Sequence, residues 1–167
     1  SLRMVVNCSE PVLARSHAEF KRRFADCGLR DSALQCSYAM AENVFAVTQS
    51  TGRGPRHVFA HRDHLSYGSQ LEVSHDGNPR ARDLMSSGKP VEGVRIRVVV
   101  GDRKPQPEGH VGEVAISGSS LFNEYLELPE VTGAARDGEW YYTSDVGFIR
   151  EGELYVLGRK TDLIIVG

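Results

Sequence analysis

The sequence predicts an α+β protein in which a partial parallel α/β sheet unit precedes an antiparallel, distorted β-barrel-like subdomain. The first 50 residues read as strand, helix and strand, the order of one parallel βαβ unit. After residue 90 the apolar residues fall into short runs separated by turns, which is typical of antiparallel strands. We therefore expect an α/β segment at 1–50, a connecting region at 51–90 and a β-rich subdomain at 91–167.

The expected α/β segment begins with an apolar run at 2–6, which predicts a buried strand. A helix is expected over 11–27, because proline suits a first helical turn and apolar residues recur at helical spacing up to the glycine at 28. A second strand is expected at 34–38. The segment 42–48 is interpreted as the start of another helix.

The expected β-rich subdomain rests on several short apolar runs. The clearest covers 94–98, where apolar and basic residues alternate as they should in a half-exposed strand. Polar residues at 150–153 lie between two runs and predict a hairpin turn. The strands are expected at 94–100, 111–117, 140–143, 148–149 and 154–157.

Composition argues against several classes of function. The 167 residues carry a net charge of −2, so no overall positive field would attract nucleic acid or an anionic membrane. We expect no membrane span, because no apolar run approaches the roughly 20 residues that cross a bilayer. Three cysteines without a CxxC pair predict neither a disulfide framework nor a zinc ribbon, and fit a reducing, cytoplasmic location.

Both ends of the chain carry apolar runs, at 2–6 and at 163–167. The second run is interpreted as a strand. A terminal strand needs a neighbour to cover its edge. We therefore expect the sequence to be a piece of a longer protein.

Three polar segments next to predicted strands contain groups suited to ligand chemistry. Asp145 follows a β-rich run and could accept hydrogen bonds from a ribose diol, although an aspartate there is also an ordinary turn residue. Tyr38 could stack on a base and Glu42 could bind Mg²⁺, although Glu42 would also suit a first helical turn. Arg159 offers a rigid fork of donors for phosphate, or belongs to a charged surface turn.

The order and context of these segments resemble the core motifs of the adenylate-forming superfamily, which contains acyl-CoA synthetases, luciferases and the adenylation domains of peptide synthetases. The resemblance covers nearly the whole chain and is weakest at 50–85. The segments at 38–42 and 162–166 look most like fatty-acyl-AMP ligases. The matching segments are NCSEP at 7–11, YAMAE at 38–42, SGKP at 87–90, VGEV at 111–114, SG at 117–118, PEVT at 129–132, YTSD at 142–145 and GR at 158–159.

The resemblance implies a role for each matching residue. Tyr38 would stack on adenine, Asp145 would hold the ribose hydroxyls, and Arg159 would reach the ribose and phosphate. Glu42 would bind Mg²⁺ near the phosphates, and it and Arg159 would be the catalytic residues. The residues implied in nucleotide binding are Cys8, Ser9, Glu10, Tyr38, Ala39, Asp145, Val156 and Arg159.

The reaction that the resemblance implies is attack of a carboxylic acid, here a fatty acid, on the α-phosphate of ATP. It gives acyl-AMP and pyrophosphate, and a thiol of CoA or of a phosphopantetheine on an acyl carrier protein would then accept the acyl group. The family's phosphate loop lies upstream of the matched segments and its catalytic lysine lies in a small C-terminal domain. The 167 residues would therefore be part of the large N-terminal domain, and alone they are expected to be inactive.

The sequence also departs from the family pattern. Ser144 stands where the family usually has glycine before the ribose-binding aspartate, which would strain the backbone if its φ were positive. Ala39 and Ala41 replace the usual glycine and threonine of the tyrosine motif. Thr161 occupies the usual hinge position and leaves Asp162 one place late.

Two alternatives stay open. His57, His61 and His64 would lie along one face of a helix and could bind zinc, although the alternation at 56–60 favours a strand and surface histidines. A degenerate homologue could also keep the fold and bind acyl groups or partners without turnover. Nucleotide binding by the complete protein would distinguish such a scaffold from an enzyme.

Overall fold

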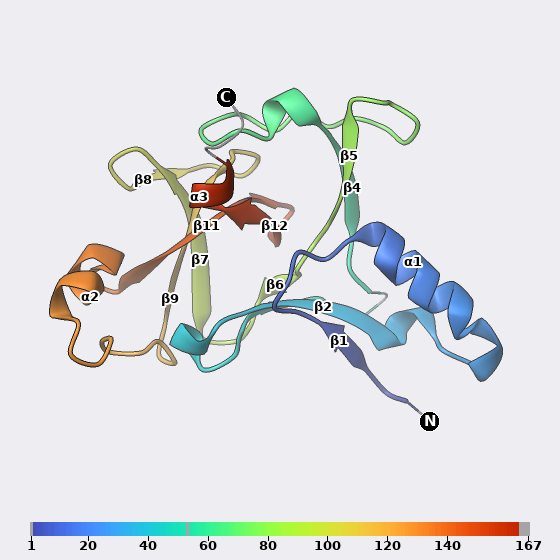
Figure 1. Cartoon of the computed structure of the whole chain (residues 1–167), viewed down its shortest axis with the longest axis horizontal. Coiled ribbons are helices and arrows are strands. Elements are labelled where there is room, and N and C mark those ends of the chain that lie inside the picture. The colour runs from blue at the N-terminus through green and yellow to red at the C-terminus, as the bar shows by residue number, and fades with distance from the viewer. Residues whose placement is uncertain (1, 53, 164–167) are drawn as a thin grey trace.

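The computed structural model describes residues 2–52 and 54–163, and these form a mixed α+β fold built mostly of sheets with few helices (Figure 1). The predicted fold class is thereby confirmed, and the described strands close no barrel. The strands are β1 Val5–Asn7, β2 Leu34–Ala39, β3 Ala46–Gln49, β4 His57–His61, β5 Ala81–Met85, β6 Lys89–Pro90, β7 Val94–Val100, β8 Lys104–Gln106, β9 Gly112–Gly118, β10 Arg136–Asp137, β11 Trp140–Arg150 and β12 Glu153–Arg159. The α-helices are α1 Ala14–Arg23, α2 Pro129–Ala135 and α3 Lys160–Leu163.

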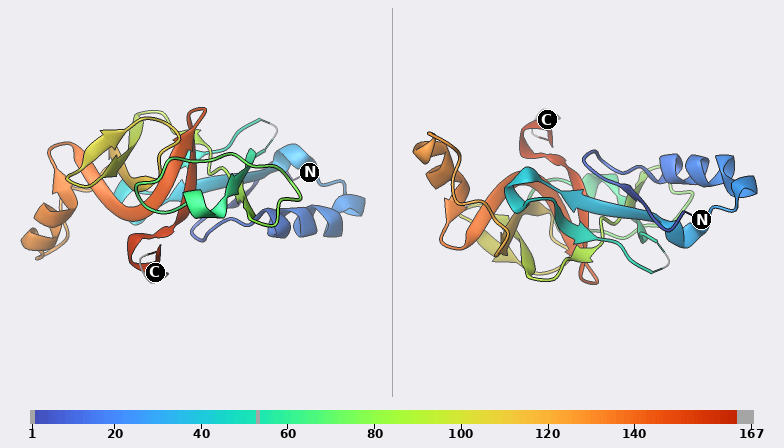
Figure 2. Two further views of the ribbon diagram at one scale, coloured as in Figure 1. Left: turned by 90° about the horizontal axis from the view of Figure 1, so that it is seen from above. Right: turned by 90° about the horizontal axis from the view of Figure 1, so that it is seen from below.

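The strands of the described residues form three sheets. The order β1-β2-β3-β6 makes the first, and β4 pairs with β5 in the second. The third is antiparallel, with the order β10-β11-β9-β7-β8 and with β12 paired to β11. Helices α1 and α2 lie at opposite ends of the molecule in all three views, with the sheets between them (Figure 2).

The N-terminal βαβ unit is present, because β1 and β2 are parallel with Val5 opposite Leu34. Two details of its prediction were wrong. The strand is shorter than 2–6 and only half-buried, and Leu2 and Met4, which precede it, are 59% and 55% exposed. The helix is also shorter, because Leu13 is still extended at φ −101° and the chain tightens into a 3₁₀ turn after Phe24.

The expected helix at 42–48 was wrong. A single 3₁₀ turn at Ala41–Asn43 leads into β3, which runs antiparallel to β2. Both Val47 and Thr48 are fully buried, so this strand lacks the alternation that would have identified it. The hairpin therefore brings the segment after β2 back across the first sheet.

The antiparallel strands at 94–100 and 111–117 were predicted closely, as β7 and β9 show. The two short strands expected at 140–143 and 148–149 are one continuous strand, β11, interrupted by a bulge. A tight turn at Glu151 and Gly152 joins β11 to β12, which confirms the predicted hairpin. Strand β11 thus has partners on both edges, β9 on one and β12 on the other.

The connecting region contains strands of its own, β4, β5 and β6. The division of the chain at 1–50, 51–90 and 91–167 stays a prediction. His57 and His61 lie at the two ends of β4 rather than on a helix, and the residues that the structure describes hold no cluster of three metal-binding side chains. The strand expected at 163–167 lies outside the described residues except for Leu163, which ends α3.

Within the described ranges, none of the helices combines the length and the apolar character that crossing a bilayer requires.

Candidate nucleotide-binding cavity

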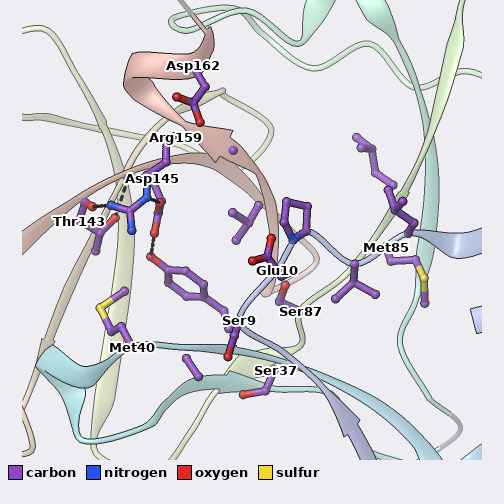
Figure 3. Close-up of a pocket in the computed structure, with 18 of the residues that line it drawn as sticks. Ser9, Glu10, Ser37, Met40, Met85, Ser87, Thr143, Asp145, Arg159 and Asp162 are labelled. Carbon is purple, nitrogen blue, oxygen red and sulfur yellow. Dashed lines mark hydrogen bonds and ion pairs between the residues drawn. The ribbon is translucent and has the colours of Figure 1, made fainter. Parts of the chain in front are cut away.

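A cavity of about 430 Å³ lies where the first sheet, the antiparallel sheet and β5 meet (Figure 3). Its size falls within the range of about 300–1,000 Å³ that is common for small-molecule sites. Its lining comes from segments that are far apart in the sequence. The lining residues are Ser9, Glu10, Pro11, Val12, Leu13, Ser37, Tyr38, Ala39, Met40, Glu42, Arg82, Asp83, Leu84, Met85, Ser87, Tyr141, Thr143, Asp145, Val156, Gly158, Arg159 and Asp162.

The carboxylate of Asp145 is the polar centre of this cavity. The hydroxyl of Tyr38 donates a hydrogen bond to its Oδ2 at 2.5 Å, and Nε of Arg159 lies 3.0 Å from its Oδ1. These contacts join the end of β2, the middle of β11 and the end of β12 (Figure 3). An ionised carboxylate has about four acceptor positions, so Asp145 retains capacity for a further donor.

A β-bulge in β11 directs this carboxylate. Between the pairs Tyr142–Ala115 and Val146–Glu113, β11 spans two more residues than β9. A bulge of this kind turns the side chains of the inserted residues away from the regular alternation. It places Asp145 on the cavity wall with its side chain only 13% exposed.

The backbone of the bulge is satisfied by local side chains. The hydroxyl of Thr143 accepts from the N–H of Asp145 at 3.1 Å and donates to the carbonyl of Val114 at 2.9 Å. Oε1 of Glu113 accepts from the N–H of Ser144 at 3.1 Å. Because its polar groups are paired, the bulge is a defined element that can hold Asp145 in one orientation.

Burial raises the pKa of Asp145 above its ordinary value, because desolvation penalises the ionised form. The hydrogen bond from Tyr38 and the charge of Arg159 act in the opposite direction, whereas Glu42 and Glu113 raise the pKa further. Burial, together with the neighbouring Asp145 carboxylate, also raises the pKa of Tyr38 well above its ordinary value. The tyrosine therefore stays a neutral donor to the Asp145 carboxylate, whose ionised form Arg159 favours.

We expect Arg159→Met to raise the pKa of Asp145 further, since it removes a positive charge 3.0 Å from the carboxylate. A carbon-13 NMR titration of the Asp145 carboxyl would measure this as a midpoint at higher pH. Arg150→Met is the matched control, because Arg150 contacts Glu151 at the other end of β11. An Asp145 midpoint that does not move in Arg159→Met would contradict the ion pair.

Glu42 also lines the cavity, and its carboxylate lies next to Tyr141 of β11. Its Oε1 accepts a hydrogen bond from the hydroxyl of Tyr125 at 2.7 Å, and the hydroxyl of Tyr141 lies 3.3 Å from the same oxygen. Its Oε2 is free of protein hydrogen bonds within the described part of the chain. Mg²⁺ in proteins is commonly bound by one or two carboxylates together with substrate phosphates and water, so a single carboxylate facing a cavity fits that ion.

The cavity brings together nearly all of the residues singled out in the sequence. Ser9, Glu10, Tyr38, Ala39, Glu42, Asp145, Val156 and Arg159 all line it. Cys8 does not, although its sulfur lies 3.6 Å from the hydroxyl of Ser9. Ser144 adopts φ 60°, the left-handed conformation that the family's glycine would allow without strain. Its side chain is exposed, and the neighbouring Asp145 still faces the cavity.

Sequence reasoning missed several residues of the site. Strand β5 contributes Arg82 to Met85 to the cavity lining, yet the surrounding segment is polar and carried no motif. Tyr125 and Tyr141, which contact Glu42, are brought there by tertiary structure alone. Asp162, which stands one place beyond the expected hinge position, lines the cavity. Thr161 is exposed, and its hydroxyl donates a hydrogen bond to the carboxylate of Asp162 at 3.1 Å.

Comparisons with known proteins show which family the chain belongs to. The family model described as AMP-binding enzyme matches residues 1–126. The long-chain-fatty-acid–AMP ligase FadD32 of Mycolicibacterium smegmatis is 31% identical over 99% of this chain and 29% of its own length. The 4-hydroxyphenylalkanoate adenylyltransferase of Mycobacterium tuberculosis is 32% identical over 99% of this chain and 28% of its own length.

A solved structure is similar as well. The fatty acyl-adenylate ligase of Legionella pneumophila, in complex with acyl adenylate and pyrophosphate, superposes with a TM-score of 0.88 at 28% identity. The match covers 98% of this chain and 30% of that one. The chain thus belongs to the AMP-binding, adenylate-forming enzyme family, and its homologues are fatty-acyl-AMP ligases and acyl-CoA synthetases. It spans less than a third of the length of the relatives described here.

Proposed function

We propose that the full-length protein is an ATP-dependent acyl-activating enzyme that forms acyl-AMP from a fatty acid. The observation that carries the proposal is the contact of Tyr38 and Arg159 with Asp145 in a cavity of about 430 Å³ that Glu42 also lines. Family membership and the fatty-acyl-AMP ligases among the homologues support this class of substrate.

In this proposal each group has a binding or charge-neutralising role. Asp145 accepts hydrogen bonds from the ribose hydroxyls, Tyr38 lies against adenine, and Arg159 reaches the ribose and phosphate. Ser9, Glu10, Ala39 and Val156 line the nucleoside pocket, and Cys8 contacts the hydroxyl of Ser9. Glu42 would hold Mg²⁺, which when bound neutralises charge on the phosphates.

The chemical contribution of these residues is alignment and electrostatic stabilisation. The fatty acid carboxylate must be held in line with the α–β phosphate bond, and water must be kept from the acyl-AMP that forms. The acceptor class that we propose for the second step is a pantetheine thiol, of CoA or of an acyl carrier protein. Dependence on ATP, together with the free cysteines Cys8, Cys27 and Cys36, fits action in the cytoplasm.

The alternative is a degenerate scaffold of the same fold that binds acyl groups or partners without turnover. Its main support is Ser144, whose left-handed backbone costs a non-glycine residue about 1–2 kcal/mol. That strain does not displace Asp145, which keeps both Tyr38 and Arg159 as partners. The enzyme is therefore the function that we propose.

ATP–pyrophosphate exchange by the full-length protein tests this function. We expect exchange that depends on a fatty acid and none from the 167-residue chain alone. Loss of each positioned charge-stabilising donor costs about 10²–10³ in rate, and the chain lacks the family's phosphate loop and C-terminal lysine. A full-length protein that shows no exchange with any fatty acid would favour the scaffold. Robust exchange by the 167-residue chain would contradict the roles given to the missing segments.

A further inference from the structure

Two tyrosine hydroxyls converge on Glu42 from distant parts of the chain. Tyr125 donates to Oε1 of Glu42 at 2.7 Å, Tyr141 lies 3.3 Å from the same oxygen, and the two hydroxyls are 2.9 Å apart. The sequence separations from Glu42 are 83 and 99 residues. Both contacts fall on one carboxylate oxygen, so the second oxygen is available to a ligand in the cavity.

The backbone around Glu42 gives its side chain little support. The residue sits in the 3₁₀ turn at Ala41–Asn43, which is followed by Val44 at φ 65° and ψ −52°. The N–H of Phe45 donates to the carbonyl of Asn43 at 2.7 Å and closes a three-residue γ-turn. Because Glu42 lies outside a regular helix or strand, the orientation of its carboxylate depends on the hydrogen bonds that its oxygens accept.

The segment that carries Tyr125 is anchored to this turn. The N–H of Phe122 donates to the carbonyl of Glu42 at 2.8 Å, so the contact involves the backbone as well as the side chain. The N–H of Tyr125 donates to the hydroxyl of Thr132 at 2.9 Å. Nη1 of Arg136 donates to the carbonyl of Asn123 at 3.0 Å.

Tyr141 is anchored differently, by β11, which also carries Asp145 four residues later. Its ring packs edge-on against Phe122 with the centroids 5.3 Å apart, and Phe122 also packs against the ring of Tyr125. Burial raises the pKa of both tyrosines, so both remain neutral hydrogen-bond donors across the physiological range. One strand thereby fixes Asp145 and a support of Glu42 relative to each other.

We propose that Tyr125 and Tyr141 are positioning residues that hold one oxygen of the Glu42 carboxylate and so present the other to a divalent cation. The inference rests on the proposed function, in which Glu42 binds Mg²⁺. Partners that orient a ligating carboxylate fix its direction and share its charge, and their loss commonly lowers metal affinity by about 10–100-fold. In this arrangement the two hydroxyls act through the Glu42 carboxylate.

Tyr125→Phe, Tyr141→Phe and the double variant of the full-length protein test the proposal. Phenylalanine keeps the ring packing on Phe122 and removes only the hydroxyl. We expect the Mn²⁺ dissociation constant of the ATP complex, measured by electron paramagnetic resonance, to rise several-fold in each single variant and by about 10–100-fold in the double variant. ATP affinity measured without metal should be unchanged, which a general loss of structure would not produce.

Tyr155→Phe is the matched control, because Tyr155 is buried like Tyr141 but stacks on Phe148 in a separate core cluster. Wild-type Mn²⁺ affinity in the double variant would overturn the proposal, as would an equal loss in Tyr155→Phe. Glu42→Gln separates this inference from the function beneath it. If Glu42→Gln weakens Mn²⁺ binding and the double variant does not, the positioning role alone is wrong. If Glu42→Gln also has no effect, the metal-binding role of Glu42 fails with it.

Discussion

Asp145→Ala in the full-length protein is expected to raise the KM for ATP by about 10²-fold and to change kcat much less. A hydrogen bond to a charged group contributes about 1.5–3 kcal/mol, and the two ribose hydroxyls would both lose their acceptor. Each 1.4 kcal/mol corresponds to about tenfold in affinity. Because the ribose contacts are the same in the ground state and the transition state, their loss weakens binding rather than the chemical step.

Steady-state kinetics with ATP as the varied substrate checks this prediction. Asp102→Ala is the matched control, because Asp102 is exposed on the turn between β7 and β8, away from the cavity lining. The thermal unfolding midpoint of each variant should be recorded, since removing Asp145 leaves the buried hydroxyl of Tyr38 without its partner. A KM for ATP that stays at the wild-type value in a folded Asp145→Ala variant would exclude the proposed ribose contact.

Glu42→Ala is expected to have the opposite kinetic signature. We expect kcat to fall by about 10²–10³, as is typical when one preorganised charge-stabilising group is lost, with a smaller change in the KM for ATP. The reason is that the charge Glu42 would help to neutralise through Mg²⁺ builds up as the α–β phosphate bond breaks. Excess Mg²⁺ should restore part of the rate, because the metal would still bind the phosphates.

Single-turnover formation of acyl-AMP, followed over a range of Mg²⁺ concentrations, measures this effect separately from product release. Glu92→Ala provides the control, since Glu92 is an exposed carboxylate outside the cavity lining. A Glu42→Ala variant with a wild-type rate and only weaker ATP binding would show that Glu42 acts in the ground state. The two substitutions together thus separate nucleotide binding from charge neutralisation.

The sequence predicted those elements whose burial follows a simple period. The alternation of apolar and basic residues at 94–98 identified strand β7, and the apolar run continues to its end at Val100. Strand β3 is buried on consecutive residues and was mistaken for a helix. The bulge in β11 broke one strand into two apparent ones, because inserted residues destroy the period of two.

The site was predictable to the extent that it is encoded in short motifs. Tyr38, Glu42, Asp145 and Arg159 each belong to such a segment, and all four line one cavity. Tyr125 and Tyr141, whose hydroxyls contact Glu42, lie 83 and 99 residues further along the chain. Their contacts with Glu42 form only when the loop and the strand that carry them pack against it. No local pattern carries that information, and the same holds for the wall formed by β5.

Equilibrium binding of ATP to the full-length protein, by isothermal titration calorimetry in the presence of Mg²⁺, tests the central claim most directly. The claim is that this cavity is a nucleotide site organised around Asp145. We predict that one ATP binds per chain and that Asp145→Ala binds it about 10²-fold more weakly, while Asp102→Ala binds it as the wild type does. Absence of binding by the wild-type protein, or equal binding by a folded Asp145→Ala variant, would contradict the claim.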